Sequence, residues 1–592
     1  MRFHGLAAQR AQVMHPTLGI AEGTVMDYDI PSTTPDRTTV DRVLRDVMVE
    51  MRDGISLATD AYLPTAEGPV PTILVRLCYG KSGDFCGLPA LGEFWTRKGY
   101  AFVAQDVRGT YGSGGVFDPG HPDSEAKDGY DTVEWIADQE WSNSRVALMG
   151  ESYYSVTTYA AATLPQPALV CIAPGDFPID RYEGSYRAGC LKLAAEAYWA
   201  IWWVAPQEHD HPGKELPGVD AWHLPVADMA AAAGLANHYF DEMVGYPIPG
   251  SRFWEYRCRR EEHEAISIPI LHWAGWYDNY LGQQLADWRR YRELDHSGGR
   301  NYLMIGPWCH DGPYGPTERT GILPVEEDGT YRWDTYQAFF DRYLMGLDNG
   351  FGEDGLVHYF VLGANEWHRV DSWPPAGVEP QTWFLAGDGS SAEGGRLVTA
   401  LPGDEAPDEY AYDPADPVAW TVGTDPYEFS FAMGDRRAIE VRPDVLVYSS
   451  DVLAVPLEIV GDLHAVLHVA TDAVDTDFTV ALVDVFPDGG VNLIQDGIQR
   501  MSLRSPEKGR ELLAPGQVYE VRVDMWSIAY RVPAGHRLRV EVSSSDFDRY
   551  DRNLNTAESL LRGTTTVVAH QRVFHDPHRP SHVVLPVVPG RH

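Results

Sequence analysis

Short apolar runs alternate with segments of helical periodicity over much of this sequence, and the alternation restricts the fold more than any other feature. The apolar runs cover residues 71–77, 101–105, 146–149, 169–173, 268–274 and 302–305. Strands that alternate with helices at this spacing form βαβ units. We therefore expect an α/β fold with a mostly parallel sheet whose two faces are covered by helices.

The chain has 592 residues, too many for one hydrophobic core, and changes in its pattern divide it into parts. One segment is rich in Trp, Ala and Leu and shows helical periodicity without strand signals, which predicts a cap inserted into the α/β domain. The last part shows short alternating strands separated by Gly, Pro and Asp, as in a β-sandwich (jelly roll). The expected parts are an N-terminal arm (1–42), the first part of an α/β domain (43–175), an inserted helical cap (176–265), the second part of the α/β domain (266–352) and a C-terminal jelly roll (353–592).

Ser152 stands where an apolar strand meets a helix-compatible segment, within Gly150-Glu151-Ser152-Tyr153-Tyr154. The pattern nearly matches the nucleophile elbow G-x-S-x-G, in which a strained turn exposes the serine hydroxyl and aims the next backbone N–H at a developing oxyanion. Tyr154 replaces the second glycine. Ser152 is a candidate nucleophile, although an ordinary serine between a strand and a helix has the same local pattern.

A serine nucleophile needs a general base and an acid that orients the base. Asp278 follows the apolar run 268–274, and His310 follows the next run, 302–305. In open α/β sheets, functional groups gather at the carboxyl ends of the strands. The order Ser152, Asp278, His310 is the one found in α/β-hydrolases, so we expect a catalytic triad of these three residues.

Several motifs in one order show that the chain resembles the cocaine esterase (CocE/NonD) family of serine hydrolases, which is related to the X-Pro dipeptidyl peptidases and the α-amino-acid ester hydrolases. The matching motifs are Met51-Arg52-Asp53-Gly54, Gln105-Asp106-Val107-Arg108-Gly109, Gly150-Glu151-Ser152-Tyr153, Gly275-Trp276-Tyr277-Asp278, Gly306-Pro307-Trp308-Cys309-His310, Asp475-Thr476-Asp477-Phe478, Ala534-Gly535-His536-Arg537 and Asp551-Arg552-Asn553-Leu554-Asn555-Thr556. The likeness covers roughly residue 43 to the C-terminus. It implies an α/β-hydrolase domain, a helical cap and a C-terminal jelly roll.

The resemblance also implies an oxyanion hole and one substrate-binding residue. The hole would consist of the Tyr79 hydroxyl and the backbone N–H of Tyr153, and Tyr280 would border the acyl pocket. A buried tyrosine with a structural role remains the alternative for Tyr79. The α-amino-acid ester hydrolases carry acidic residues directly after the triad aspartate, but Asn279 and Tyr280 follow Asp278, which argues against binding of a substrate ammonium there.

These features together predict an acyl hydrolase that uses an acyl-enzyme and acts on a small-molecule ester. One alternative is a hydrolase of amides or peptides, such as a β-lactam side-chain acylase or an X-Pro dipeptidyl peptidase. Another is a non-catalytic carbohydrate-binding protein with a decayed hydrolase domain. We expect no cofactor and no metal, because His209-Asp210-His211 has no further ligand at a suitable spacing.

The composition bears on partners and location. Lys+Arg 47 against Asp+Glu 86 gives a formal net charge of -39, which repels nucleic acid and anionic lipid. The first thirty residues contain no apolar core of a signal peptide, and no later segment is long enough to span a bilayer. Six cysteines in a chain of this size form no disulfide framework. We expect a cytoplasmic protein that binds neither nucleic acid nor membranes, and a homo-oligomer is compatible with the sequence.

Overall fold

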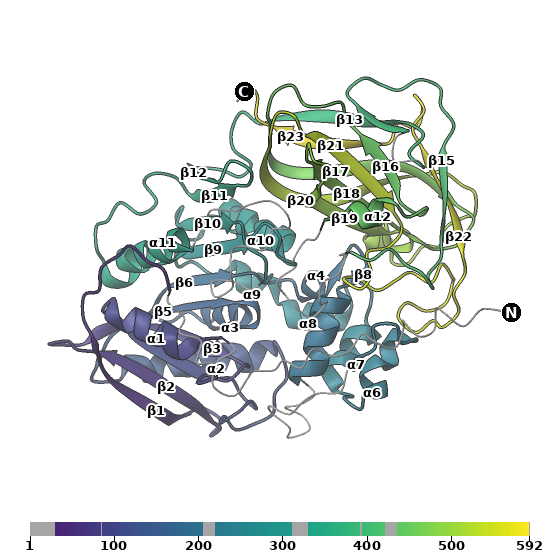
Figure 1. Cartoon of the computed structure of the whole chain (residues 1–592). Helices are drawn as coiled ribbons and strands as arrows, with labels where there is room; N and C mark the ends of the chain where they lie inside the picture. Colours follow the sequence, from purple (N-terminus) through teal and green to yellow (C-terminus); the bar gives the residue numbers. More distant parts are fainter. Residues whose placement is uncertain are drawn as a thin grey trace.

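The computed structural model describes residues 30–83, 86–204, 219–310, 329–390, 394–420 and 435–590. Two large sheets organise these residues, one in the first part of the chain and one in the last (Figure 1). The cap helices lie beside the first sheet, and the second sheet lies at the far side of the molecule in green and yellow. The expected fold class, an α/β-hydrolase domain with a cap and a C-terminal β-sandwich, is confirmed.

The first sheet has ten strands, and its central strands are parallel from β4 to β11. The strands at its two edges, β1, β2 and β12, pair antiparallel with their neighbours. In sheet order the strands are β1 (Val40–Glu50), β2 (Ser56–Pro64), β4 (Ala101–Asp106), β3 (Val70–Leu77), β5 (Ser142–Glu151), β6 (Leu169–Gly175), β9 (Ile270–Gly275), β10 (Asn301–Gly306), β11 (Val357–Val361) and β12 (Glu366–Val370).

Helices cover both faces of this sheet because its central strands are apolar on both sides. Ile73 and Val75 of β3 pack in one core with α1 (Leu88–Arg97) and α11 (Thr330–Phe340). Leu74, which points the other way, packs in a second core with α2 (Pro122–Ala137), α3 (Ser152–Ala162) and α10 (Leu281–Leu294). The alternation follows from the two-residue period of a strand.

The cap contains short elements rather than long helices. The apolar periodicity of the sequence predicts cap helices at 191–204 and 226–243. The first is helical from residue 193 to 204, with two π-helical turns joined through Tyr198 and Trp199, and the second is interrupted near Gly234, which has a φ of 74°. A two-stranded ribbon that the sequence did not predict precedes them. The elements are α4 (Arg181–Ser185), β7 (Tyr186–Arg187), β8 (Cys190–Leu191), η1 (Leu193–Ala197), η2 (Ala200–Val204), η3 (Val226–Asp228), α6 (Met229–Ala232), α7 (His238–Gly245), α8 (Arg252–Cys258) and α9 (Arg260–Glu264).

The C-terminal part is a mostly antiparallel β structure, and its apolar core is continuous with residues of β9, α10 and β10 in the first part of the chain. Its longest strands, β17 and β20, pair along most of their lengths. The strands are β13 (Glu379–Gly387), β14 (Gly395–Val398), β15 (Asp408–Tyr412), β16 (Leu446–Ser449), β17 (Leu457–Thr471), β18 (Asp477–Val485), β19 (Val491–Arg500), β20 (Tyr519–Val532), β21 (Arg537–Ser543), β22 (Ala569–Phe574) and β23 (His582–Val587). Short helical turns lie between them: α12 (Arg437–Glu440), η6 (Met501–Leu503) and η7 (Pro506–Lys508).

The first sheet continues past the boundary expected at residue 352. Strand β11 pairs parallel with β10, and β12 pairs antiparallel with β11. Both strands are short and apolar in places, like those of the jelly roll, and the local pattern of a strand does not show which sheet it joins. We propose that the division between the two parts lies after Val370.

Candidate active site

The turn between β5 and α3 has the backbone geometry of a nucleophile elbow. Ser152, the first residue of α3, has a φ of 51°, in the left-handed region that non-glycine residues rarely adopt. A Cβ on Gly150 would lie 2.2 Å from the carbonyl oxygen of Tyr154, so only glycine fits there. Tyr154 is accommodated because its side chain points elsewhere: its hydroxyl donates to Glu151 Oε1 at 2.5 Å.

The structure brings Ser152, His310 and Asp278 together in one chain of hydrogen bonds. His310 Nε2 lies 3.0 Å from Ser152 Oγ, and His310 Nδ1 lies 2.6 Å from Asp278 Oδ2. The side chain of Asp278 is fully buried and that of His310 is 10% exposed. An ionised carboxylate only accepts, so Nδ1 carries the proton and the lone pair of Nε2 faces the serine hydroxyl.

Two loops at the carboxyl ends of neighbouring parallel strands carry Asp278 and His310. The Tyr277 amide donates to the Trp308 carbonyl oxygen at 3.1 Å. A Cβ on Gly275 would lie 2.3 Å from that same oxygen, so the glycine lets the loops touch. The second carboxylate oxygen of Asp278 accepts from the Tyr280 amide at 2.7 Å, which fixes the carboxylate plane.

Tyr79 lies two residues beyond β3 and reaches the same place. Its hydroxyl accepts from the indole N–H of Trp199 at 2.8 Å, and it also hydrogen-bonds the Ser152 side chain. Burial raises the pKa of Tyr79 well above its usual range, although both hydrogen bonds act in the opposite direction. The phenol is therefore neutral and can donate a proton.

Tyr153 presents its backbone and its side chain to different surroundings. Its amide lies in the first turn of α3, where a helix offers no acceptor four residues earlier. Its hydroxyl donates to Glu125 Oε1 at 2.5 Å and accepts from the Gly120 amide at 3.3 Å. These two bonds hold the side chain of Tyr153. Its backbone amide is the group that we expect in the oxyanion hole, and this stays a prediction.

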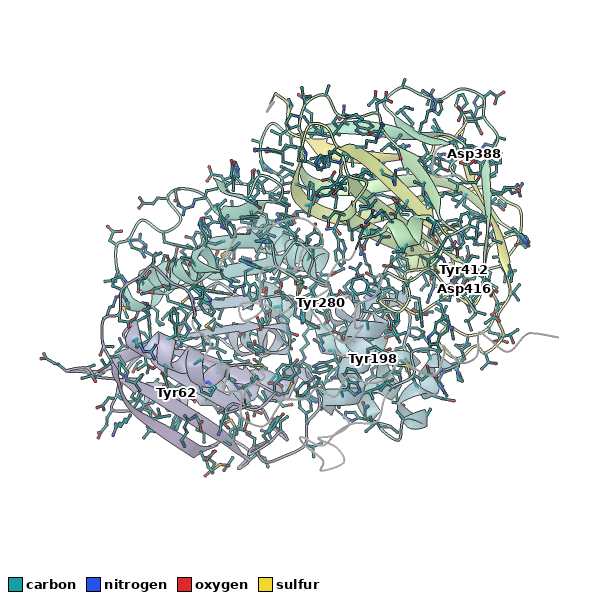
Figure 2. All side chains as sticks on the ribbon, viewed as in Figure 1. Tyr62, Tyr198, Tyr280, Asp388, Tyr412 and Asp416 are labelled. Carbon is teal, nitrogen blue, oxygen red and sulfur yellow. The ribbon has the colours of Figure 1, made fainter. Side chains whose placement is uncertain are left out.

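Tyr280 lies between the α/β sheet and the cap (Figure 2). Its ring meets the His310 ring edge-on, with centroids 5.1 Å apart, and its hydroxyl donates to Glu196 Oε1. The ammonium of Lys192 lies 4.5 Å from the centre of the same ring. Tyr280 therefore contacts Asp278 through its amide and His310 through its ring, and its position beside an acyl pocket stays a prediction.

Sequence reasoning gave no role in the site to four residues of this neighbourhood: Lys192, Glu196, Asp176 and Trp199, the last of which it predicted to be part of the cap core. Burial lowers the pKa of Lys192 to about 7, although Glu196 and Glu183 act in the opposite direction. Burial and the charge of Asp278 raise the pKa of Asp176 well above its usual range. Lys192 and Glu196 are charged residues in an otherwise apolar segment, L-K-L-A-A-E-A-Y-W. This contrast is the sequence feature from which these two residues could have been identified.

No metal site and no membrane span were found within the described ranges. No cluster of three or more His, Cys, Asp or Glu side chains there has an arrangement that could hold a metal ion. His209, Asp210 and His211 lie outside those ranges. Among the helices that the structure describes, none combines the length and apolar character needed to cross a membrane.

Two family models match the chain in succession. The model described as X-Pro dipeptidyl-peptidase (S15 family) matches residues 53–312. The model of the X-Pro dipeptidyl-peptidase C-terminal non-catalytic domain matches residues 349–584. The first match contains all six candidate site residues.

Known proteins resemble the chain over nearly its whole length. Cocaine esterase from Rhodococcus sp. (strain MB1 Bresler) is 36% identical over 92% of this chain and 98% of its own. A solved structure of an α-amino acid ester hydrolase has a TM-score of 0.82 at 27% identity and covers 95% of this chain and 100% of its own. An aminopeptidase from a marine sediment archaeon, Thaumarchaeota archaeon, has a TM-score of 0.80 at 26% identity and covers 95% and 99%. Because a cocaine esterase is similar over almost the whole chain, and because the turn at Ser152 has the geometry of a nucleophile elbow, the chain belongs to the cocaine esterase-like (CocE/NonD) family of α/β-hydrolases.

Proposed function

We propose that this protein is a serine hydrolase that cleaves carboxylic esters through an acyl-enzyme, with Ser152, His310 and Asp278 as its catalytic triad. The observation that carries the proposal is the hydrogen-bonded chain from Ser152 Oγ through the His310 ring to Asp278, at a strained strand-to-helix turn. The similarity to a cocaine esterase along almost the whole chain supports the choice of an ester as substrate.

In the first half of the reaction, His310 Nε2 takes the proton from Ser152 Oγ as that oxygen attacks the ester carbonyl carbon. The carbonyl oxygen becomes an oxyanion, which accepts hydrogen bonds from the Tyr79 hydroxyl and the Tyr153 amide. Asp278 stabilises the imidazolium. The bond between the carbonyl carbon and the alcohol oxygen then breaks. The leaving oxygen takes the proton from Nε2, and the product leaves as an alcohol.

In the second half, water repeats these steps on the acyl-enzyme. His310 Nε2 takes a proton from the water as its oxygen attacks the acyl carbon, and the bond to Ser152 breaks with return of that proton to Oγ. The acid leaves and the free enzyme is restored. Tyr280 and the cap would border the acyl group, since the Tyr280 ring packs against the His310 ring.

Replacement of Ser152 tests the proposal directly. Ser152→Ala should abolish the hydrolysis of p-nitrophenyl esters and labelling by a fluorophosphonate probe, with an unchanged circular dichroism spectrum. The oxyanion hole alone leaves only a residual rate, so a fall of about 10⁴-fold or more is expected. Activity within tenfold of wild type would falsify the assignment of the nucleophile.

Amide or peptide hydrolysis is the second candidate activity. The observation that favours it is the likeness to an aminopeptidase and to an X-Pro dipeptidyl-peptidase model. A panel of aryl esters, aryl amides and dipeptide anilides, assayed with one preparation, separates the two activities. We expect kcat/KM for the esters to exceed that for the anilides, and the opposite order would assign the protein to the peptidases.

We further propose a cytoplasmic location, no nucleic-acid or membrane partner, and a small-molecule substrate. All six cysteines lie among the described residues, where they are buried and none is in a disulfide, which suits a reducing compartment. The formal charge of -39 opposes binding to phosphate backbones and anionic lipid. Association into a homo-oligomer remains a prediction that sedimentation analysis of the purified chain can check.

A further inference from the structure

Trp199 of the cap forms a hydrogen bond to the proposed oxyanion hole. It lies between η1 and η2, and its indole Nε1 donates to the Tyr79 hydroxyl at 2.8 Å. Trp199 is 9% exposed and Tyr79 is 6% exposed, so water scarcely competes for this bond. The bond joins the cap to the end of β3 in the sheet.

The direction of this bond determines what the Tyr79 hydroxyl can do. An indole N–H only donates, so the phenol oxygen accepts from Trp199. The phenol proton must then serve a partner other than Trp199, and the Ser152 side chain is one that hydrogen-bonds Tyr79. Trp199 thus keeps the donor side of the hydroxyl turned toward the nucleophile.

The Trp199 ring also packs on the other tyrosine of the proposed hole. It stacks on the Tyr153 ring, with centroids 5.7 Å apart and planes 21° from parallel. Tyr239 of α7 holds it from another side, edge-on at 5.8 Å. One cap residue therefore contacts both residues that would bind the oxyanion.

We propose that Trp199 is a positioning residue of the oxyanion hole, which it completes by fixing the hydroxyl of Tyr79. The proposal rests on the proposed function and adds to it that the cap, as well as the sheet, prepares the site for the transition state. A donor held in place before the reaction needs no reorganisation as the charge develops. Loss of the indole N–H therefore lowers kcat and leaves KM nearly unchanged.

A double-mutant cycle between Trp199 and Tyr79 tests the proposal. Loss of one oxyanion donor costs about 100-fold or more in kcat, and we expect this for Tyr79→Phe. Trp199→Phe should cost about tenfold, a part of that effect, with KM changed less than threefold. In the Tyr79→Phe background, Trp199→Phe should cause no further fall, because the hydroxyl that it positions is absent.

Two further variants separate the hydrogen bond from packing. Replacement of Trp199 by β-(3-benzothienyl)alanine keeps the shape of the ring and removes the N–H, and it should reproduce the fall in kcat. Trp202→Phe is the matched control in the same segment, where Trp202 stacks on Tyr198. It should retain kcat within threefold.

The outcomes distinguish this inference from the proposed function. Equal losses from Trp199→Phe in both backgrounds, or full kcat with benzothienylalanine at position 199, would show that Trp199 acts by packing alone and would overturn the inference. Ser152→Ala would remain inactive in that case. An active Ser152→Ala variant would instead remove the proposed function, whatever the cycle shows.

Discussion

The site contains two buried aspartates close enough to influence each other, Asp278 and Asp176. Asp278 contacts His310, whereas Asp176 Oδ1 accepts from the Gly275 amide at 3.2 Å. Burial and the charge of Asp278 both raise the pKa of Asp176, so the Asp176 carboxyl is held neutral. The hydrogen bond to His310 therefore favours Asp278, and not Asp176, as the proposed triad acid.

Asp278→Asn should lower kcat by about 10⁴-fold, because an amide stabilises the wrong tautomer of the histidine and carries no charge to balance the imidazolium. Asp176→Asn is the matched control. A neutral amide there resembles the protonated carboxyl, so kcat should stay within about fivefold of wild type. Steady-state kinetics on one aryl ester measures both, and a larger loss from Asp176→Asn would reverse the assignment.

At the scale of elements, the sheet was predictable because its strands are recognisable one at a time. Runs such as 146–149 and 302–305 are apolar throughout, as expected of strands buried on both faces. The sequence between the second and third apolar runs predicts a helix over 132–139, but helix α2 begins ten residues earlier, at Pro122. Its first turns are polar and are started by the His121 side chain, which accepts from the Ser124 amide, and this kind of start is not among the usual capping signals.

The site was predictable to the extent that it depends on the sheet. Asp278 and His310 follow adjacent parallel strands, so their proximity follows from the α/β pattern. The proposed roles of Tyr79 and Tyr280 came from a family resemblance, whereas the role of the Tyr153 amide is also implied by the local elbow pattern. Trp199 and Glu196 were not predicted, because their positions depend on how the cap packs across the sheet, and short irregular elements leave no periodic signal of that packing.

Acid should destabilise the fold through His272, a buried histidine of β9. His272 Nδ1 lies 3.0 Å from the Tyr159 hydroxyl and 3.2 Å from Gln284 Nε2, and burial lowers the pKa of His272 to about 3. The unfolded chain binds this proton near pH 6.5. Between pH 6.5 and about 3 the unfolded state therefore binds one more proton, and the free energy of unfolding falls as the pH falls, by about 1.4 kcal/mol per pH unit.

His272→Gln removes this ionisation and keeps a polar side chain of similar reach. The decrease in Tm between pH 7 and pH 4.5, followed by scanning calorimetry, should be smaller in the variant than in wild type. His296→Gln, on the surface, should keep the wild-type decrease. An unchanged decrease in His272→Gln would show that acid unfolding does not begin at this residue.

At the scale of the whole molecule, the jelly roll contacts the cap, and the cap in turn contacts the candidate site. The Leu191 amide donates to Asp551 Oδ1 at 2.6 Å, and Arg500 Nη1 donates to the Gly189 carbonyl oxygen at 3.2 Å. These contacts hold the ribbon of β7 and β8, which leads directly into Lys192, Glu196 and Trp199. The C-terminal part can therefore affect the site through the cap, in addition to its hydrogen bonds with Trp276 and Tyr277 in the loop that carries Asp278.

Arg187 of this ribbon is the residue on which the docking should depend most. Its Nη1 lies 2.9 Å from Asp496 Oδ1, its Nη2 donates to the Asp496 carbonyl oxygen at 2.7 Å, and its guanidinium lies 3.6 Å from the centre of the Trp526 ring. Loss of one partner of a buried ion pair costs about 3–5 kcal/mol, at the lower end here because Arg549 also pairs with Asp496.

Arg187→Met should therefore lower Tm by about 2–3 °C and should also lower kcat, since the ribbon positions the segment that carries Trp199. Arg52→Met is the control, because Arg52 forms a half-exposed ion pair with Asp131 and such pairs contribute about 1 kcal/mol or less. Calorimetry and ester kinetics on the two variants measure both effects. If Arg187→Met lost stability but kept the kcat of wild type, the jelly roll would stabilise the chain without setting the geometry of the site, and the link from the C-terminal sheet to the oxyanion hole would have to be abandoned.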